Sequence, residues 1–89
     1  MDEAVDKQMR KNYLERRVND LRECDIALEK QDFASIASMG HKLKGNGLSF
    51  GFPLLTELGA LLEQSAKEKD LDQIQVLLNK IKSFVNEQS

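Results

Sequence analysis

The stretch GHKLKGNGLSFGFP, residues 40–53, holds the clearest structural boundary in this chain of 89 residues. At 100° per residue, its apolar and small residues extend one face of a helix that we expect to begin at Phe33, with Asp32 as N-cap. This predicted core face consists of Ile36, Met39, Gly40, Leu43, Gly47 and Phe50. Gly51 and Phe52 then break the pattern, and Pro53 suits the first turn of the next helix. The stretch therefore predicts two consecutive helices with a sharp break between them.

The rest of the chain repeats the same 3.6-residue period. One helix is predicted over about residues 13–30, another after Pro53, and a last one after Asp70, which forms a capping-box pattern with Gln73. Their apolar stripes are Leu14, Val18, Leu21, Cys24 and Leu28; Leu54, Leu55, Leu58, Leu61, Leu62 and Ala66; and Leu71, Ile74, Leu77, Leu78, Ile81 and Val85. Residues 1–12 fall off the first stripe and are predicted to form a short helix or arm. Short connections predict an all-α, antiparallel four-helix bundle over residues 13–89.

Composition excludes several classes of function. The chain is 40% hydrophobic and 31% charged, as expected of a globular domain. Its net charge of −2, with basic and acidic residues interspersed, argues against nucleic acid as a ligand. No segment approaches the roughly 20 apolar residues of a membrane span, and the polar N-terminus is unlike a signal peptide. Cys24 alone forms neither an intramolecular disulfide nor a zinc site. We expect a cytoplasmic protein without membrane contact or metal.

The opposite face of the predicted second helix collects the only histidine of the chain. An exposed histidine without context is most simply a polar surface residue. A glycine at an exposed helix position, however, costs about 1 kcal/mol relative to alanine, and Gly45 has no packing partner to explain it. The missing side chain is understandable if a partner must approach His41 closely, with Lys44 as a nearby cation. The candidate partner-binding residues on this face are Ala37, Ser38, Gly45 and Leu48.

This combination suits phosphoryl chemistry. A neutral imidazole can attack phosphorus through a ring nitrogen, and a neighbouring lysine can neutralise phosphoryl oxygens. The GNG sequence lacks the spacing of a phosphate-binding loop, so nothing in the chain is expected to bind a nucleotide. The phosphoryl group would therefore come from one protein and leave to another.

The residues His41, Leu43, Lys44 and Gly45, followed by Phe50 and Gly51, resemble the signature of histidine-containing phosphotransfer (HPt) domains of bacterial phosphorelays. The similarity covers nearly all of the chain from Tyr13 onward. It implies that His41 carries the phosphoryl group and that Lys44 stabilises it. It also implies that Gly45 leaves room for the receiver domain of a response regulator, whose own Asp and Mg²⁺ do most of the catalysis.

The resemblance also implies a third-helix residue that binds the inner ring nitrogen of the histidine. Glu63 matches this position, with Gln64 as the neighbour to compare and a solvated glutamate as the alternative. One departure is Gly40, where the family commonly has alanine.

The expectation is thus a monomeric phosphocarrier that has no kinase activity and no cofactor of its own. A sensor or hybrid histidine kinase would be an indirect partner. Two alternatives stay open: a helical adaptor that binds a receiver domain without being phosphorylated, and an HPt domain excised from a chemotaxis-type or hybrid kinase. The presence of both His41 and Lys44 favours the carrier over the adaptor.

Overall fold

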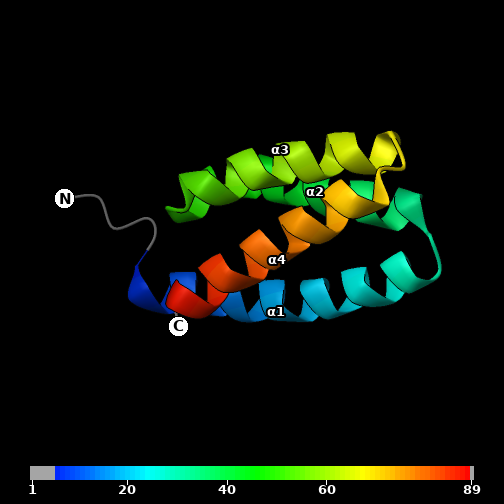
Figure 1. Ribbon diagram of the computed structural model, residues 1–89. Helices are drawn as coiled ribbons and strands as arrows, with labels where there is room; N and C mark the ends of the chain where they lie inside the picture. Colours follow the sequence, from blue (N-terminus) through cyan, green and yellow to red (C-terminus); the bar gives the residue numbers. More distant parts are fainter. Residues whose placement is uncertain (1–5, 89) are drawn as a thin grey trace.

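The computed structural model describes residues 6–88, and within them it contains four α-helices, a short 3₁₀ helix and no strand. The helices are α1 (Lys7–Glu29), α2 (Phe33–Asn46), α3 (Pro53–Lys67) and α4 (Leu71–Gln88), with the 3₁₀ helix η1 (Leu48–Phe50) between α2 and α3. Consecutive helices run in opposite directions, so the beginning of α1 and the end of α4 lie at the same end of the bundle (Figure 1). The predicted all-α antiparallel four-helix bundle is confirmed.

Three of the helix boundaries follow the signals in the sequence. The side chain of Asp32 accepts a hydrogen bond from the amide of Ser35 at 3.2 Å and caps α2. Pro53 lies in the first turn of α3, where its missing N–H is not needed. The amide of Gln73 donates to Asp70 Oδ1 at 3.1 Å, the first bond of the predicted capping box. These short-range contacts set where α2, α3 and α4 begin.

The predicted beginning of the first helix was wrong. Helix α1 begins at Lys7, because Asp6 acts as its N-cap and accepts from the amide of Met9 at 2.8 Å. The predicted boundary after residue 12 therefore falls inside a continuous helix. The first two turns of α1 are exposed, so they show no apolar stripe. The remainder of the predicted arm, residues 1–5, lies outside the described residues.

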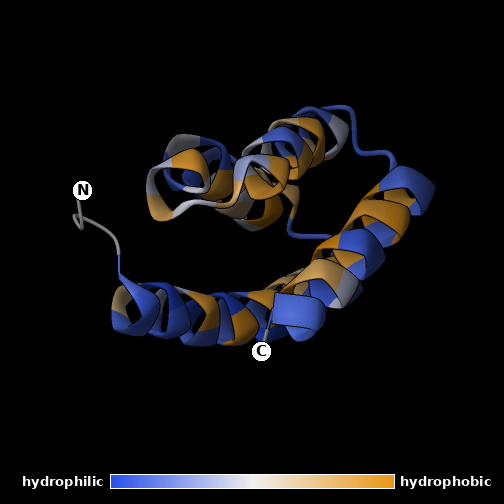
Figure 2. Ribbon diagram, turned by 90° about the vertical axis from the view of Figure 1, so that its left-hand side faces the viewer, coloured by the Kyte–Doolittle hydropathy of each residue, from blue (hydrophilic) through white to orange (hydrophobic). Residues whose placement is uncertain are grey.

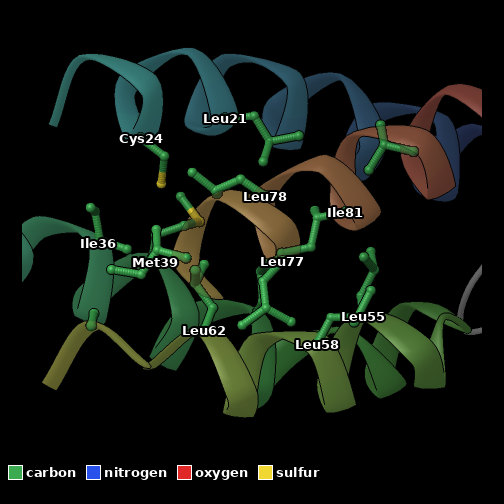
Figure 3. Packing of buried hydrophobic residues seen from close by; sticks show 14 of the residues in the cluster. Leu21, Cys24, Ile36, Met39, Leu55, Leu58, Leu62, Leu77, Leu78 and Ile81 are labelled. Carbon is green, nitrogen blue, oxygen red and sulfur yellow. The ribbon is translucent and has the colours of Figure 1, made fainter. Parts of the chain in front are cut away.

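The core lies between the helices, whose hydrophobic sides face one another (Figure 2). In Figure 3, Leu21 and Cys24 of α1 point toward Leu78 of α4. Burial raises the pKa of the Cys24 thiol to about 12, which keeps it protonated near neutral pH. No helix within residues 6–88 has the length and apolar character needed to cross a bilayer.

The predicted stripes were too broad in α3 and α4 and incomplete in α1. Leu54, Leu61 and Leu71 are 43%, 52% and 40% exposed, because two neighbouring helices cannot cover the full width of these stripes. Helix α1 instead buries three residues that its predicted stripe omitted: Tyr13, Arg17 and Ala27.

Tyr13 joins α1 to the end of α2. Its ring is fully buried and stacks on Phe50 at a centroid distance of 4.4 Å, with the guanidinium of Arg17 4.5 Å from the ring centre. Its hydroxyl donates to Asn46 Oδ1 at 2.6 Å. Burial raises the pKa of this hydroxyl, so it stays a donor. The contact holds the last turn of α2, which includes Gly45, against the bundle.

We expect Tyr13→Phe to lower the free energy of unfolding by about 1 kcal/mol, because it leaves the partly buried side-chain oxygen of Asn46, Oδ1, without its hydrogen-bond donor. Urea unfolding would measure the change. In an Asn46→Ala background, the same substitution should cost much less. An equal cost in both backgrounds would show that the hydrogen bond is not the cause.

Candidate functional site

The structure brings His41 of α2 next to Glu63 of α3. The side chain of His41 is 73% exposed, whereas that of Glu63 is only 14% exposed, and His41 Nδ1 lies 3.3 Å from Glu63 Oε2. A carboxylate at this position favours the tautomer that carries the ring proton on Nδ1. The lone pair then lies on Nε2, the nitrogen available for reaction.

Close approach of the two helix backbones makes this contact possible. A Cβ atom on Gly40 would lie 2.5 Å from the backbone nitrogen of Glu63, and a Cβ on Gly59 would lie 2.6 Å from that of Lys44. Neither position has space for a side chain. Gly40 immediately precedes His41, so the pair of glycines sets how far the imidazole lies from the Glu63 carboxylate.

Two lysines also contact Glu63 and form a charge cluster with it and His41. Lys44 Nζ lies 3.6 Å from Glu63 Oε1, and Lys67 Nζ lies 3.4 Å from Oε2. Desolvation acts to raise the pKa of Glu63, but the hydrogen bond from Lys67 and the charges of Lys67, Lys44 and His41 lower it overall. Glu63 is therefore an ionised carboxylate at neutral pH.

Lys67 is the member of this cluster that sequence reasoning missed. Its signal was available: Glu63 and Lys67 are four residues apart on one helix, with the acidic residue first, which is the favourable order for an ion pair. The other candidate on α3, Gln64, donates its amide to Glu68 at 2.9 Å. It is therefore Glu63, of these two neighbours, that contacts the histidine.

The candidate partner-binding residues are not equally accessible. Apart from the adjacent backbone of α2, no heavy atom lies within 4 Å of the position that a Cβ of Gly45 would take, so the backbone there is open to a partner. Leu48 is 65% exposed and Ser38 is also exposed. Ala37 is half-buried against the core and offers a partner only part of its surface.

The arrangement combines an exposed imidazole, an ionised carboxylate at its inner nitrogen and two lysines. It can accept a negatively charged electrophile at Nε2, because Glu63 balances the positive charge that the ring gains on reaction. Within residues 6–88, no group of three or more His, Cys, Asp or Glu side chains is placed to hold a metal ion.

The chain is thus a four-helix bundle whose second helix presents an exposed histidine, and a carboxylate of the third helix contacts the inner ring nitrogen of this histidine. The family model described as the Hpt domain matches residues 8–87, nearly the whole chain. The chain therefore belongs to the Hpt domain family, whose members are histidine phosphotransfer modules of two-component phosphorelays and interact with response-regulator receiver domains. Comparison with curated proteins and with solved structures gives no match.

Proposed function

We propose that this protein is a phosphocarrier that accepts a phosphoryl group on His41 Nε2 and exchanges it with the aspartate of a receiver domain. The observation that carries the proposal is the 3.3 Å contact between Nδ1 of the exposed His41 and the ionised carboxylate of Glu63 in an Hpt-family bundle. This contact gives the ring the tautomer that a nucleophilic Nε2 requires.

In the transfer step, the Nε2 lone pair forms the N–P bond while the P–O bond of the receiver's aspartyl phosphate breaks. The aspartate leaves as a carboxylate with the electron pair, and the ring becomes an imidazolium that keeps its proton on Nδ1 beside Glu63. Transfer in the other direction reverses the same bond changes. Mg²⁺ is expected on the receiver domain, and we propose no cofactor for this chain.

Lys44 is suited to contact the phosphoryl oxygens. It lies one turn after His41 on α2, and its side chain is 52% exposed, so it can turn from Glu63 toward a group bound at the ring. A phosphoryl group in transfer carries delocalised negative charge, which a lysine neutralises as a point charge.

The wider role that we propose is that of a cytoplasmic monomer between a receiver domain and, indirectly, a sensor or hybrid histidine kinase. The net charge of −2 supports a protein partner rather than nucleic acid. The protein would transfer phosphoryl groups without autonomous kinase activity.

The test is transfer itself. The protein would be incubated with phosphoramidate, the adduct located by mass spectrometry and ³¹P NMR, and receiver domains added with Mg²⁺. An acid-labile phosphoryl group on His41 that a receiver removes would support the carrier. A protein that binds a receiver but stays unmodified would favour the adaptor instead.

We expect Gly45→Glu to slow transfer to the receiver at least about ten-fold, because its side chain would fill the open backbone surface beside His41 with bulk and negative charge. Phosphorylation by the much smaller phosphoramidate should continue. Ser83→Glu, which adds the same carboxylate at an exposed position of α4, is the matched control. Unchanged transfer by Gly45→Glu would show that the receiver docks elsewhere.

A further inference from the structure

The carboxylate of Glu63 contacts three basic groups at this site. Both His41 Nδ1, at 3.3 Å, and Lys67 Nζ, at 3.4 Å, contact the same oxygen of Glu63, Oε2, whereas Lys44 Nζ lies 3.6 Å from Oε1. Lys67 is 62% exposed and is not needed to fill the core. Its place on Oε2 therefore calls for an electrostatic explanation.

The two lysines approach Glu63 from opposite directions along the helices. Helices α2 and α3 run antiparallel (Figure 1), and Gly59 lies against the backbone of Lys44 while Gly40 lies against that of Glu63. Lys67 is one turn further along α3, which places it toward the beginning of α2. Lys44 is thus on the side of Gly45, and Lys67 on the side of Ala37.

The charges explain why two lysines are useful. In the form that reacts, whose imidazole is neutral, the cluster holds one negative charge and two positive charges before phosphorylation. A bound phosphoryl group adds up to two negative charges next to the carboxylate. If Lys44 turned to the phosphoryl oxygens and Lys67 were absent, only the imidazolium ring would offset the carboxylate, which would then repel the phosphoryl group and compete with it for Lys44.

We propose that Lys67 is a positioning residue that stays on Glu63 as its counter-ion and so releases Lys44 to the phosphoryl group. Lys67 acts through Glu63 and need not contact the phosphoryl group. The inference rests on the proposed function, since it assigns Lys67 a part in phosphorylation of His41.

Phosphoramidate isolates this chemistry from receiver docking. The Nε2 lone pair forms the N–P bond, the donor's P–N bond breaks, and its ammonium nitrogen leaves as ammonia. The ring takes up the positive charge as an imidazolium with its proton on Nδ1. Removing Lys67 should slow this step because the negative charge of Glu63 would then compete with the phosphoryl group for Lys44.

The experiment measures the rate of phosphoramidate phosphorylation in Lys67→Gln and Lys67→Arg, each in the wild-type chain and in a Glu63→Gln background. We expect Lys67→Gln to lower the rate about three- to five-fold, the range of an exposed ion pair, and Lys67→Arg to retain it. In the Glu63→Gln background, Lys67→Gln should have almost no effect, because a neutral amide needs no counter-ion. Lys42→Gln, which removes the cation next to His41 in sequence but not a contact of Glu63, is the matched control.

The outcomes distinguish two possible roles of Lys67, as the counter-ion of Glu63 and as a residue that stabilises the end of α3. A lysine in the last turn of a helix also stabilises the helix end, and that role would change the unfolding free energy rather than the Glu63-dependent rate. An equal loss of rate in both Glu63 backgrounds, or a loss no larger than that of Lys42→Gln, would overturn the inference while leaving the carrier function standing. A wild-type protein that takes up no phosphoryl group would overturn both.

Discussion

His41→Gln should abolish phosphoryl acceptance and leave the bundle folded. The amide nitrogen of glutamine is not a nucleophile, because its lone pair is delocalised into the carbonyl group. The histidine side chain is 73% exposed and outside the core, so its replacement should change the free energy of unfolding by no more than about 0.5 kcal/mol. We therefore expect a complete loss of phosphoryl acceptance and only a small change in stability.

Incubation with phosphoramidate followed by intact mass and ³¹P NMR would measure the loss, and urea unfolding would check the fold. His41 is the only histidine in the chain, so the variant has no imidazole that could substitute. Uptake of acid-labile phosphate by His41→Gln would place the acceptor on another type of residue and contradict the site.

Gly40→Ala and Gly45→Ala should change stability in opposite directions, although the two positions are five residues apart in α2. At Gly40 a Cβ would lie 2.5 Å from the Glu63 nitrogen and 2.7 Å from the Gly59 oxygen, both backbone atoms that move only with their helix. Overpacking against backbone atoms this close should cost about 3 kcal/mol, the upper end of its usual range, and the alanine returns about 1 kcal/mol in helix propensity, so we expect a net loss on the order of 2 kcal/mol. At Gly45 the Cβ meets nothing within 4 Å beyond the adjacent backbone of its own helix, so only the propensity gain of up to about 1 kcal/mol remains.

Urea or thermal unfolding of the two variants would measure these changes, and the loss expected for Gly40→Ala corresponds to a melting temperature about 10 °C below that of the wild-type protein. Separation of α2 from α3 would also move Glu63 from His41, so Gly40→Ala should slow phosphorylation by phosphoramidate. Similar stability changes in both variants would mean that α2 and α3 can adjust without cost.

The helices and the side of α2 on which His41 lies follow from the sequence alone. Asp32, Pro53 and Asp70 act on amides and backbone angles within one turn, and such short-range contacts are readable without knowledge of the fold. The helical period likewise placed His41 opposite the buried Ile36 and Leu43, because the angle between residues of one helix does not depend on its neighbours. The beginning of α1 escaped prediction because its Asp6 cap precedes exposed turns without an apolar stripe.

The groups that lie beside the histidine depend instead on how the helices pack against one another. Resemblance implied a role for Glu63, but its 3.3 Å contact with the ring depends on how closely α2 and α3 pack at Gly40 and Gly59. Lys67 lies at the site because it pairs with Glu63, and the packing of α3 against α2 brings this carboxylate to His41. The exposure of Leu61 also depends on which helices surround α3. Distances between helices result from the packing of two surfaces at once, and the pattern of one segment does not contain that information.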